Sequence, residues 1–403
     1  MSVGRFIGLN AIFLAVFAFI LFYSIIQLQP TSPSFRHRSL YLRDDGSFDI
    51  LIFSDLHFGE EEHGWGIAQD RKSLAIMNGI LDAEDPDFVV INGDLITGEN
   101  TFRENASSYV DQVVAPLVSR DIPWASTYGN HDSSYNLSRE ALYESESRYP
   151  LSHTQYSDKA LGGVTNYHIE VLDRSGRAAL ILWFLDSQGG SLFQTKGNQT
   201  QTEIPGVVSN ATVDWLTETH QQLIDRHGRV LPSLLFVHIP PRLFAETQTS
   251  ESFAPARFPG LNKDYPLSTQ HGLGLTDSRL VDALLSLEGL HSIHSGHDHG
   301  ASWCASRQRP APKIDQRDHS SDAPIFLCFA RHTGQGGYGD WTRGARMLRV
   351  TVPEMADGSG DGGHVKGKVE VESWVRLQSM QAISRVSLNE TYGQDEYPLE
   401  DVE

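Results

Sequence analysis

Five short apolar segments of this 403-residue chain each end in residue types that bind metal ions. The clearest is the run Phe88–Ile91, which leads through Asn92 and Gly93 to Asp94. The other four segments deliver, in chain order, Asp55 and His57; Asn130, His131 and Asp132; His238; and His297 and His299. Strands hold their ends in register while the loops after them converge, so we expect these side chains to meet at one edge of an α/β sheet.

The spacing of apolar residues predicts the elements around these segments. Strands are expected at 48–54, 88–91 and 122–128, with helices near 74–81 and 109–117 between them, and this alternation favours parallel strands with right-handed crossovers. Further strands are predicted at 166–171, 178–186, 234–237, 291–295, 325–329, 345–352 and 368–375, and a further helix at 213–225. The sequence therefore predicts an α/β fold with two mixed β-sheets flanked by helices, in one domain over 47–380.

The two ends of the chain differ from this domain. Residues 6–28 are almost wholly apolar and uncharged, which is long enough to cross a bilayer as a helix. We predict that residues 1–30 are a membrane anchor rather than a cleaved signal, because no small-residue cleavage site follows the apolar run. Residues 31–46 are expected to be a linker. The acidic residues 381–403 are expected to be a disordered tail.

Charge and cysteine content restrict the partners and the compartment. The net charge of −19 argues against binding to nucleic acid, which needs a basic face. Cys304 and Cys328 could form a disulfide in an oxidising compartment, or remain two buried thiols. Glycosylation sequons, which are used only in a secretory lumen, begin at Asn105, Asn136, Asn198, Asn210 and Asn389. The arginines that follow the apolar run favour instead a cytosolic location for the domain after it. We expect a domain in the secretory or vacuolar lumen or outside the cell.

The residue types in the five segments predict a two-metal site for phosphate-ester hydrolysis. Two ions about 3.5–4 Å apart activate a water and neutralise phosphoryl oxygens, and they need a shared carboxylate. Asp94 suits that role. Asp55 and His57, one residue apart, would point the same way from an extended backbone, as would His297 and His299. Mixed Asp, His and Asn ligands suit Mn, Fe or Zn.

Other residues are candidates for proton transfer and substrate contact. His131 directly follows Asn130, so we expect it to point away from the metals and to protonate the leaving group, with Asp132 holding its tautomer or raising its pKa. Arg331 and His332 precede a glycine-rich loop and are candidates for binding phosphate, although Arg331 could equally be a structural ion-pair partner. Three further residues could line the cleft or only pack: Trp65, Glu99 and Tyr338.

From about Phe48 to Arg346 the five segments resemble the signature blocks of the calcineurin-like metallophosphoesterases. Within that superfamily the chain resembles a branch of fungal membrane-anchored phosphatases and small plant phosphatases classed with the purple acid phosphatases. The segments that carry this closer resemblance are Gly93–Asn100, Tyr149–Gln155 and Arg331–Trp341.

The resemblance implies a four-layer sandwich and a dinuclear site in which a metal-bridging hydroxide attacks phosphorus in line. It also implies the ligand assignment: Asp55, His57 and His299 on one ion, Asn130, His238 and His297 on the other, Asp94 bridging, and His131 as the leaving-group acid. Two positions depart from the purple enzymes. Thr97 stands where they place an iron-binding tyrosine, and His57 where they place glycine. A coloured Fe(III)-tyrosinate site is therefore not expected.

These observations predict a metal-dependent phosphatase that hydrolyses phosphate monoesters of a protein or a small molecule. A phosphodiesterase would carry the same motifs, because only the shape of the pocket separates the two activities. A binding protein on the same fold is a third interpretation, and it would be expected to lack ligands.

Overall fold

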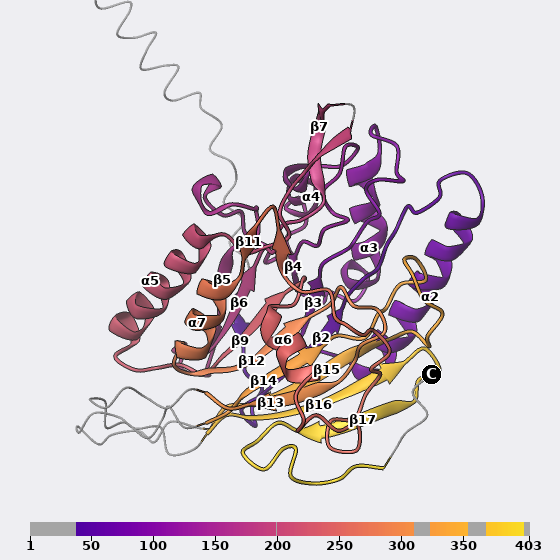
Figure 1. Cartoon of the computed structure of the whole chain (residues 1–403). Coiled ribbons are helices and arrows are strands. Elements are labelled where there is room, and N and C mark those ends of the chain that lie inside the picture. The colour runs from indigo at the N-terminus through magenta and orange to yellow at the C-terminus, as the bar shows by residue number, and fades with distance from the viewer. Residues whose placement is uncertain (1–37, 199, 310–322, 354–367, 399–403) are drawn as a thin grey trace, which may run out of the picture. The chain divides into compact units, whose positions relative to one another are not determined.

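Two mixed β-sheets pack face to face in the computed structural model, which describes residues 38–198, 200–309, 323–353 and 368–398 (Figure 1). The six-stranded sheet contains, in spatial order, β17 (Ala382–Ser387), β16 (Glu370–Leu377), β15 (Gly344–Thr351), β2 (Ser47–Phe53), β3 (Phe88–Asn92) and β4 (Trp124–Thr127). The seven-stranded sheet contains β1 (Leu40–Tyr41), β5 (Tyr167–Leu172), β6 (Ala178–Leu185), β9 (Ser233–Val237), β12 (Leu290–Ser295), β14 (Ile325–Phe329) and β13 (Cys304–Arg307).

Helices cover the outer faces of both sheets, and two hairpins extend from the loops. The helices are α2 (Trp65–Glu84), α3 (Tyr109–Val118), α4 (Arg139–Glu146), α5 (Asn210–His227), α6 (Arg242–Gln248) and α7 (Ser278–Ser286). Short 3-10 turns lie at Ala106–Ser108 and Lys159–Leu161. The hairpins pair β7 (Ser191–Gly197) with β8 (Thr200–Glu203), and β10 (His271–Gly272) with β11 (Leu275–Thr276).

Strand β2 shows why its sequence is a continuous apolar run. Successive side chains of a strand point to opposite faces. Ile50 and Ile52 enter the core between the sheets, whereas Leu51 and Phe53 pack with residues of α2 and α3. A strand covered on both faces needs apolar residues throughout. On the far side, α5 and α7 pack on the seven-stranded sheet, so the layers run helix, sheet, sheet, helix (Figure 1). The predicted α/β fold is confirmed.

The parallel strands of both sheets end at one shared edge. β2, β3 and β4 are parallel neighbours, as are β6, β9, β12 and β14. The sheets meet where these strands stop, because Ser54 bridges to His332 and the Asn92 side chain donates to the carbonyl of His294 at 3.2 Å. The loops that leave these strands therefore open into the same region.

The structure corrects both predicted ends of the domain. The predicted linker 31–46 includes β1, which pairs with β5. The predicted tail 381–403 includes β17 and, after it, the buried Leu388 and Tyr392. The Tyr392 hydroxyl donates to the carbonyl of Cys304 at 2.8 Å, so this segment is held against the seven-stranded sheet despite its acidic composition. Cys304 and Cys328, opposite each other on β13 and β14, form a disulfide.

The predicted anchor at 6–28 lies outside the described residues. Among the residues that are described, none of the helices has the length and apolarity needed to span a bilayer.

Candidate metal centre

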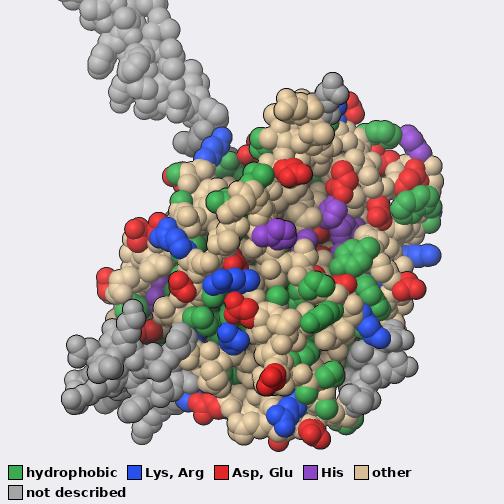
Figure 2. Space-filling model, viewed as in Figure 1, with side chains coloured by type: hydrophobic (Ala, Val, Ile, Leu, Met, Phe, Trp, Pro, Cys, Tyr) green, Lys and Arg blue, Asp and Glu red, His purple; other side chains and the backbone are tan. Residues whose placement is uncertain are grey.

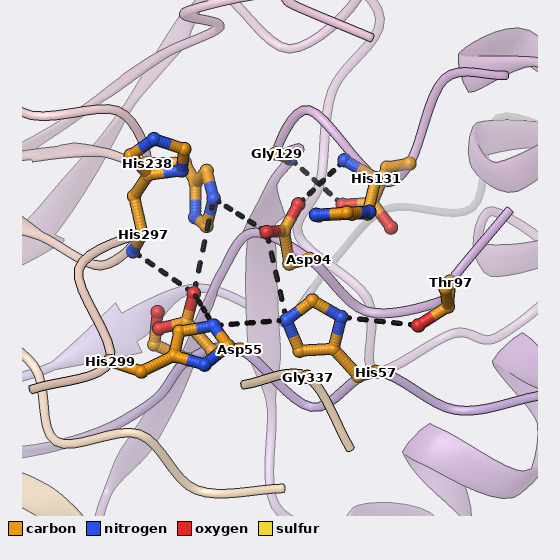
Figure 3. Close-up of polar contacts among 12 residues, drawn as sticks. Asp55, His57, Asp94, Thr97, Gly129, His131, His238, His297, His299 and Gly337 are labelled. Atoms are coloured by element: carbon orange, nitrogen blue, oxygen red, sulfur yellow. Dashed lines mark hydrogen bonds and ion pairs between the residues drawn. The ribbon is translucent and has the colours of Figure 1, made fainter. Parts of the chain in front are cut away.

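Both sheets contribute side chains to one cluster at the shared strand edge (Figure 3). The six-stranded sheet supplies Asp55 and His57 after β2, Asp94 after β3 and Asn130 after β4. The seven-stranded sheet supplies His238 after β9, and His297 and His299 after β12. The seven predicted ligands thus come from five separate strand ends.

The backbone turns sharply at these strand ends. Asp55, His57, Asp94 and His297 have φ values of 56°, 50°, 50° and 75°, in the left-handed region that such residues rarely adopt. The extended backbone expected at Asp55–His57 and at His297 is therefore wrong; the side chains converge because the chain turns. Backbone strain of this kind persists only where the surrounding structure imposes it, and it concentrates at functional sites.

One group of ligands consists of Asp55, His57 and His299, whose donor atoms all lie within 4.8 Å of one another. The Nε2 atoms of His57 and His299 are 3.1 Å apart, and His299 Nε2 is 3.6 Å from Asp55 Oδ1. All three residues are buried. We call this group the loop-covered half, because the loop 333–341 lies against the rings of His57 and His299.

The second group contains Asp94, His238 and His297, again within 4.8 Å of one another. His238 Nε2 lies 3.0 Å from Asp94 Oδ2, and the same Asp94 oxygen lies 3.8 Å from His57 Nε2. Asp94 therefore stands between the two groups. Asn130 directly follows Gly129, where an added Cβ atom would lie 2.6 Å from His238 Cδ2, and its Oδ1 atom is buried with no hydrogen-bond partner among the described residues. We call His238, His297 and Asn130 the strand-held half.

The hydrogen bonds of the imidazoles show that the site fits cations. His238 Nδ1 and His299 Nδ1 each lie 2.9 Å from a backbone carbonyl, of Asn92 and Tyr338 respectively. A carbonyl only accepts, so these nitrogens carry protons and the Nε2 atoms of the neutral rings present lone pairs. His299 Nε2 then faces a second imidazole nitrogen, and His238 Nε2 faces a carboxylate. A shared proton or a cation can lie between such atoms, and Asn130 Oδ1 is a further ligand atom that has no hydrogen-bond partner among the described residues.

The pKa shifts of His57, His297 and His299 agree with neutral imidazole ligands, and that of His238 does not. Burial lowers the pKa of His299 and lowers that of His57 well below its usual value. Burial and the neighbouring His238 lower the pKa of His297 to about 3. His238 differs, because the Asp94 carboxylate outweighs burial and raises its pKa to about 9. A proton or a metal ion is thus favoured between His238 and Asp94.

His131 lies beside the ligands and reaches the surface. Its backbone N–H donates to Asp94 Oδ1 at 2.8 Å, and its ring packs edgewise on His57 with centroids 5.0 Å apart. Its side chain is 35% exposed. Histidine side chains gather near the middle of the face that Figure 2 shows. Burial opposes the shift, but the carboxylates of Asp94 and Glu99 raise the pKa of His131 to about 10. This shift favours the protonated ring, which can donate a proton.

The carboxylate that contacts His131 is Glu99, with Oε1 2.5 Å from Nδ1. Asp132, expected in that role, is fully buried and accepts from the backbone N–H groups of Gly129 at 2.8 Å and Ile96 at 3.1 Å. Asp132 therefore fixes the loop that carries Asn130 and His131. The prediction that Asp132 holds the tautomer of His131 is therefore wrong, whereas the prediction that it helps raise the pKa of His131 is confirmed, since the charge of Asp132 adds to those of Asp94 and Glu99.

Arg331 and His332 both lie inside the protein rather than at a surface that phosphate could reach. Arg331 is fully buried and donates to the carbonyl of Thr342 at 2.8 and 2.5 Å and to the Ser302 hydroxyl at 3.2 Å. His332 is 2% exposed, and its ring lies 3.8 Å from that of His299. The described contacts of Arg331 give it a structural role that is made by hydrogen bonds to a carbonyl and a hydroxyl.

Three further residues orient the ligands. Thr97 Oγ1 lies 3.1 Å from His57 Nδ1, so the two departures from the purple pattern contact each other. Asn92 and Tyr338 act through backbone carbonyls. The sequence signalled Thr97 by its position after Asp94 and Tyr338 only as a residue that could line the cleft, whereas nothing in the side-chain pattern signalled Asn92.

The comparisons with known proteins agree with this geometry. The family model for calcineurin-like phosphoesterase matches residues 48–301. The chain is 25% identical over 372 residues to "Probable inactive purple acid phosphatase 14" of Arabidopsis thaliana, covering 85% of this chain and 84% of that protein. It is 28% identical over 344 residues to "Phosphatase DCR2" of Saccharomyces cerevisiae, covering 77% of this chain but 53% of that protein.

Among solved structures, a dimetal phosphatase from Danio rerio is similar at 14% identity and a TM-score of 0.49, covering 85% of this chain and 99% of that one. The match to the family model spans more than half of the chain and includes every ligand described above. The chain belongs to the calcineurin-like phosphoesterase family.

Proposed function

We propose that this protein is a metal-dependent phosphatase that hydrolyses phosphate monoesters of a protein or a small molecule. The observation that carries the proposal is the set of buried donors that face one another, with His57 and His299 Nε2 atoms 3.1 Å apart and Asn130 Oδ1 unpartnered. Two cations held there would acidify a bound water and offset the charge of the phosphoryl oxygens.

The chain's own residues divide the remaining work. Asp55, His57 and His299 would hold one cation, and Asn130, His238 and His297 the other, with Asp94 between them. His131 holds a proton within reach of the surface, whereas His57, His238 and His299 are at most 2% exposed. A leaving-group oxygen therefore meets His131 first. Glu99 orients the His131 ring and stabilises its charge.

The names of the relatives do not decide between catalysis and binding. One is called a phosphatase and another a probable inactive purple acid phosphatase. The complete ligand set of this chain favours catalysis. A buried polar atom such as Asn130 Oδ1, which has no hydrogen-bond partner among the described residues, costs stability unless a cation binds it, and this supports a site that still holds metal.

The direct test uses protein that has been stripped with a chelator and reloaded with Mn²⁺. We expect p-nitrophenyl phosphate to be hydrolysed only after reloading, and faster than bis(p-nitrophenyl) phosphate. Faster cleavage of the bis ester would make the protein a phosphodiesterase. Two bound Mn²⁺ ions without turnover of either ester would instead support a binding protein.

We also propose that residues 6–28 anchor the protein in a membrane, with the catalytic domain in the secretory or vacuolar lumen or outside the cell. The disulfide between Cys304 and Cys328 supports an oxidising compartment. Four sequon asparagines are exposed and available to a glycan: Asn105, Asn198, Asn210 and Asn389. Glycosidase treatment of protein from its native membrane should lower the apparent mass; an unchanged mass contradicts the proposal.

A further inference from the structure

A glycine-rich loop, residues 333–341, closes over the half of the centre formed by Asp55, His57 and His299. Gly337 has φ 73°, and a Cβ atom there would come within 2.3 Å of His299 Cε1 and 2.9 Å of His57 Cδ2 (Figure 3). Only glycine permits this approach. The loop thus lies directly against two ligand rings, which is why we call this half loop-covered.

Tyr338, the next residue, makes three separate contacts with His299. Its carbonyl accepts from His299 Nδ1 at 2.9 Å, and its hydroxyl accepts from the His299 backbone N–H at 2.9 Å. Its ring stacks on the imidazole, with centroids 4.1 Å apart and planes 10° from parallel. The hydroxyl also donates to Asp264 at 2.7 Å, and Asp264 accepts from the N–H of Gly300 at 2.6 Å.

Burial does not explain this position. Tyr338 is 50% exposed, so placing its ring here removes little apolar surface from water. The contacts instead fix two properties of the His299 ring, its tautomer and its orientation. The carbonyl determines which nitrogen carries the proton, and the stacked ring determines the plane in which Nε2 points towards Asp55 and His57.

We infer that Tyr338 is a positioning residue that fixes the imidazole of His299 and thereby retains the cation of the loop-covered half. The inference rests on the proposed metal centre. It also states that the two cations are held unequally, since the matching residue of the strand-held half is the fully buried Asn92 at the end of β3. Loss of a residue that orients a metal ligand typically costs about 10–100-fold in metal affinity.

The experiment is a calorimetric titration of chelator-stripped protein with Mn²⁺ alone. We expect two equivalents in the wild type. In Tyr338→Ala one equivalent should keep its affinity and the other should weaken by about 10–100-fold. Tyr338→Phe keeps the stacked ring and removes only the hydroxyl, so it should lose less; the backbone carbonyl of residue 338 remains in both variants. Tyr41→Ala is a matched control, because Tyr41 is 51% exposed and lies on β1, away from the centre.

Double variants identify which half is affected. His57→Ala with Tyr338→Ala should lose one equivalent and keep the other at wild-type affinity, because both changes act on the same cation. His238→Ala with Tyr338→Ala should instead lose one equivalent and bind the other about 10–100-fold more weakly. Wild-type affinity for both equivalents in Tyr338→Ala would overturn the inference. If Tyr338→Ala does not fold, Tyr338→Phe and Asp264→Asn decide: a weakened equivalent supports the inference, and wild-type binding in both refutes it.

The titration separates this inference from the proposed function. A wild type that binds two Mn²⁺ ions without hydrolysing p-nitrophenyl phosphate refutes the phosphatase and leaves the role of Tyr338 decided by the titration alone. A wild type that binds no Mn²⁺ overturns both.

Discussion

The two halves of the metal centre have the same ligand chemistry but different supports. The strand-held half is oriented by the carbonyl of Asn92, a fully buried residue within β3. The loop-covered half is oriented by Thr97 and by Tyr338, which is half exposed. Exposed loops open at lower free energy than buried strands. Two sets of similar ligands can therefore bind their ions with different affinities, depending on whether the residues that orient them are buried or exposed.

The largest expected effect comes from breaking both halves together. Asp94→Asn removes the carboxylate that lies 3.0 Å from His238 and 3.8 Å from His57. We expect kcat/KM for p-nitrophenyl phosphate to fall by roughly 10³-fold or more, because several kcal/mol of transition-state stabilisation depend on the cations. Asp111→Asn is the control, since Asp111 is a half-exposed carboxylate on α3. Equal activity of Asp94→Asn and the wild type would contradict the two-metal site.

Removing and restoring the metal should show the difference between the two halves as a difference in thermal stability. A cation that binds only the native state stabilises it by about 2.7 kcal/mol at 100 times its Kd. We expect Mn²⁺ to raise the Tm of stripped protein in two steps as its concentration increases, the strand-held half filling first. Differential scanning calorimetry measures this. A single step that Tyr338→Ala leaves unchanged would show that the halves are equivalent.

Acid should weaken the sheet that carries β12. His294 on this strand is fully buried and stacks on Phe236, and burial lowers its pKa well below the usual value of 6.5. Below that pH the unfolded chain binds a proton that the folded chain excludes, so stability falls as pH falls from about 6.5, by up to roughly 1.4 kcal/mol per pH unit. Urea unfolding of stripped protein at pH 7 and pH 5 should show a smaller difference in His294→Gln; an equal difference would exclude this histidine as the cause.

The smallest change tests the loop-covered half alone. Thr97→Val keeps the shape of the side chain but removes the hydroxyl 3.1 Å from His57 Nδ1. We expect the affinity for one Mn²⁺ equivalent to fall by about 10-fold, with the other unchanged. Thr101→Val is the control, since Thr101 is a buried threonine of the same loop whose hydroxyl bonds only to the carbonyl of Gly98 among the described contacts. Equal weakening of both equivalents would argue against separate supports.

The sequence predicted the parts of this site that local patterns encode. Apolar runs located the strands, and the polar residues at their ends, such as Asp94 and His238, were identified by type. What it did not predict depends on geometry. Asn92 and Tyr338 orient imidazoles through carbonyls, which every residue has. Glu99 rather than Asp132 contacts the His131 ring, because the turn at 129–132 directs the Asp132 side chain back to the N–H of Gly129.

The edges of the fold were missed for a related reason. β17 has the sequence AISRVS, and only Ile383, Ser384 and Val386 of its six residues are buried. An edge strand with one covered face carries a weak apolar signal, and the acidic residues after it obscured that signal further. β1 is two residues long, so no period can be read from it.

The division of the ligands between two sheets has a consequence for the order of events during synthesis and folding of the chain. Both halves need residues that follow β12, yet Asp55 and Asp94 are made long before. A growing polypeptide cannot complete either half until its later strands have emerged and docked. Cation uptake would then follow the docking of these strands, so a chain that holds both cations would be one whose two sheets have assembled.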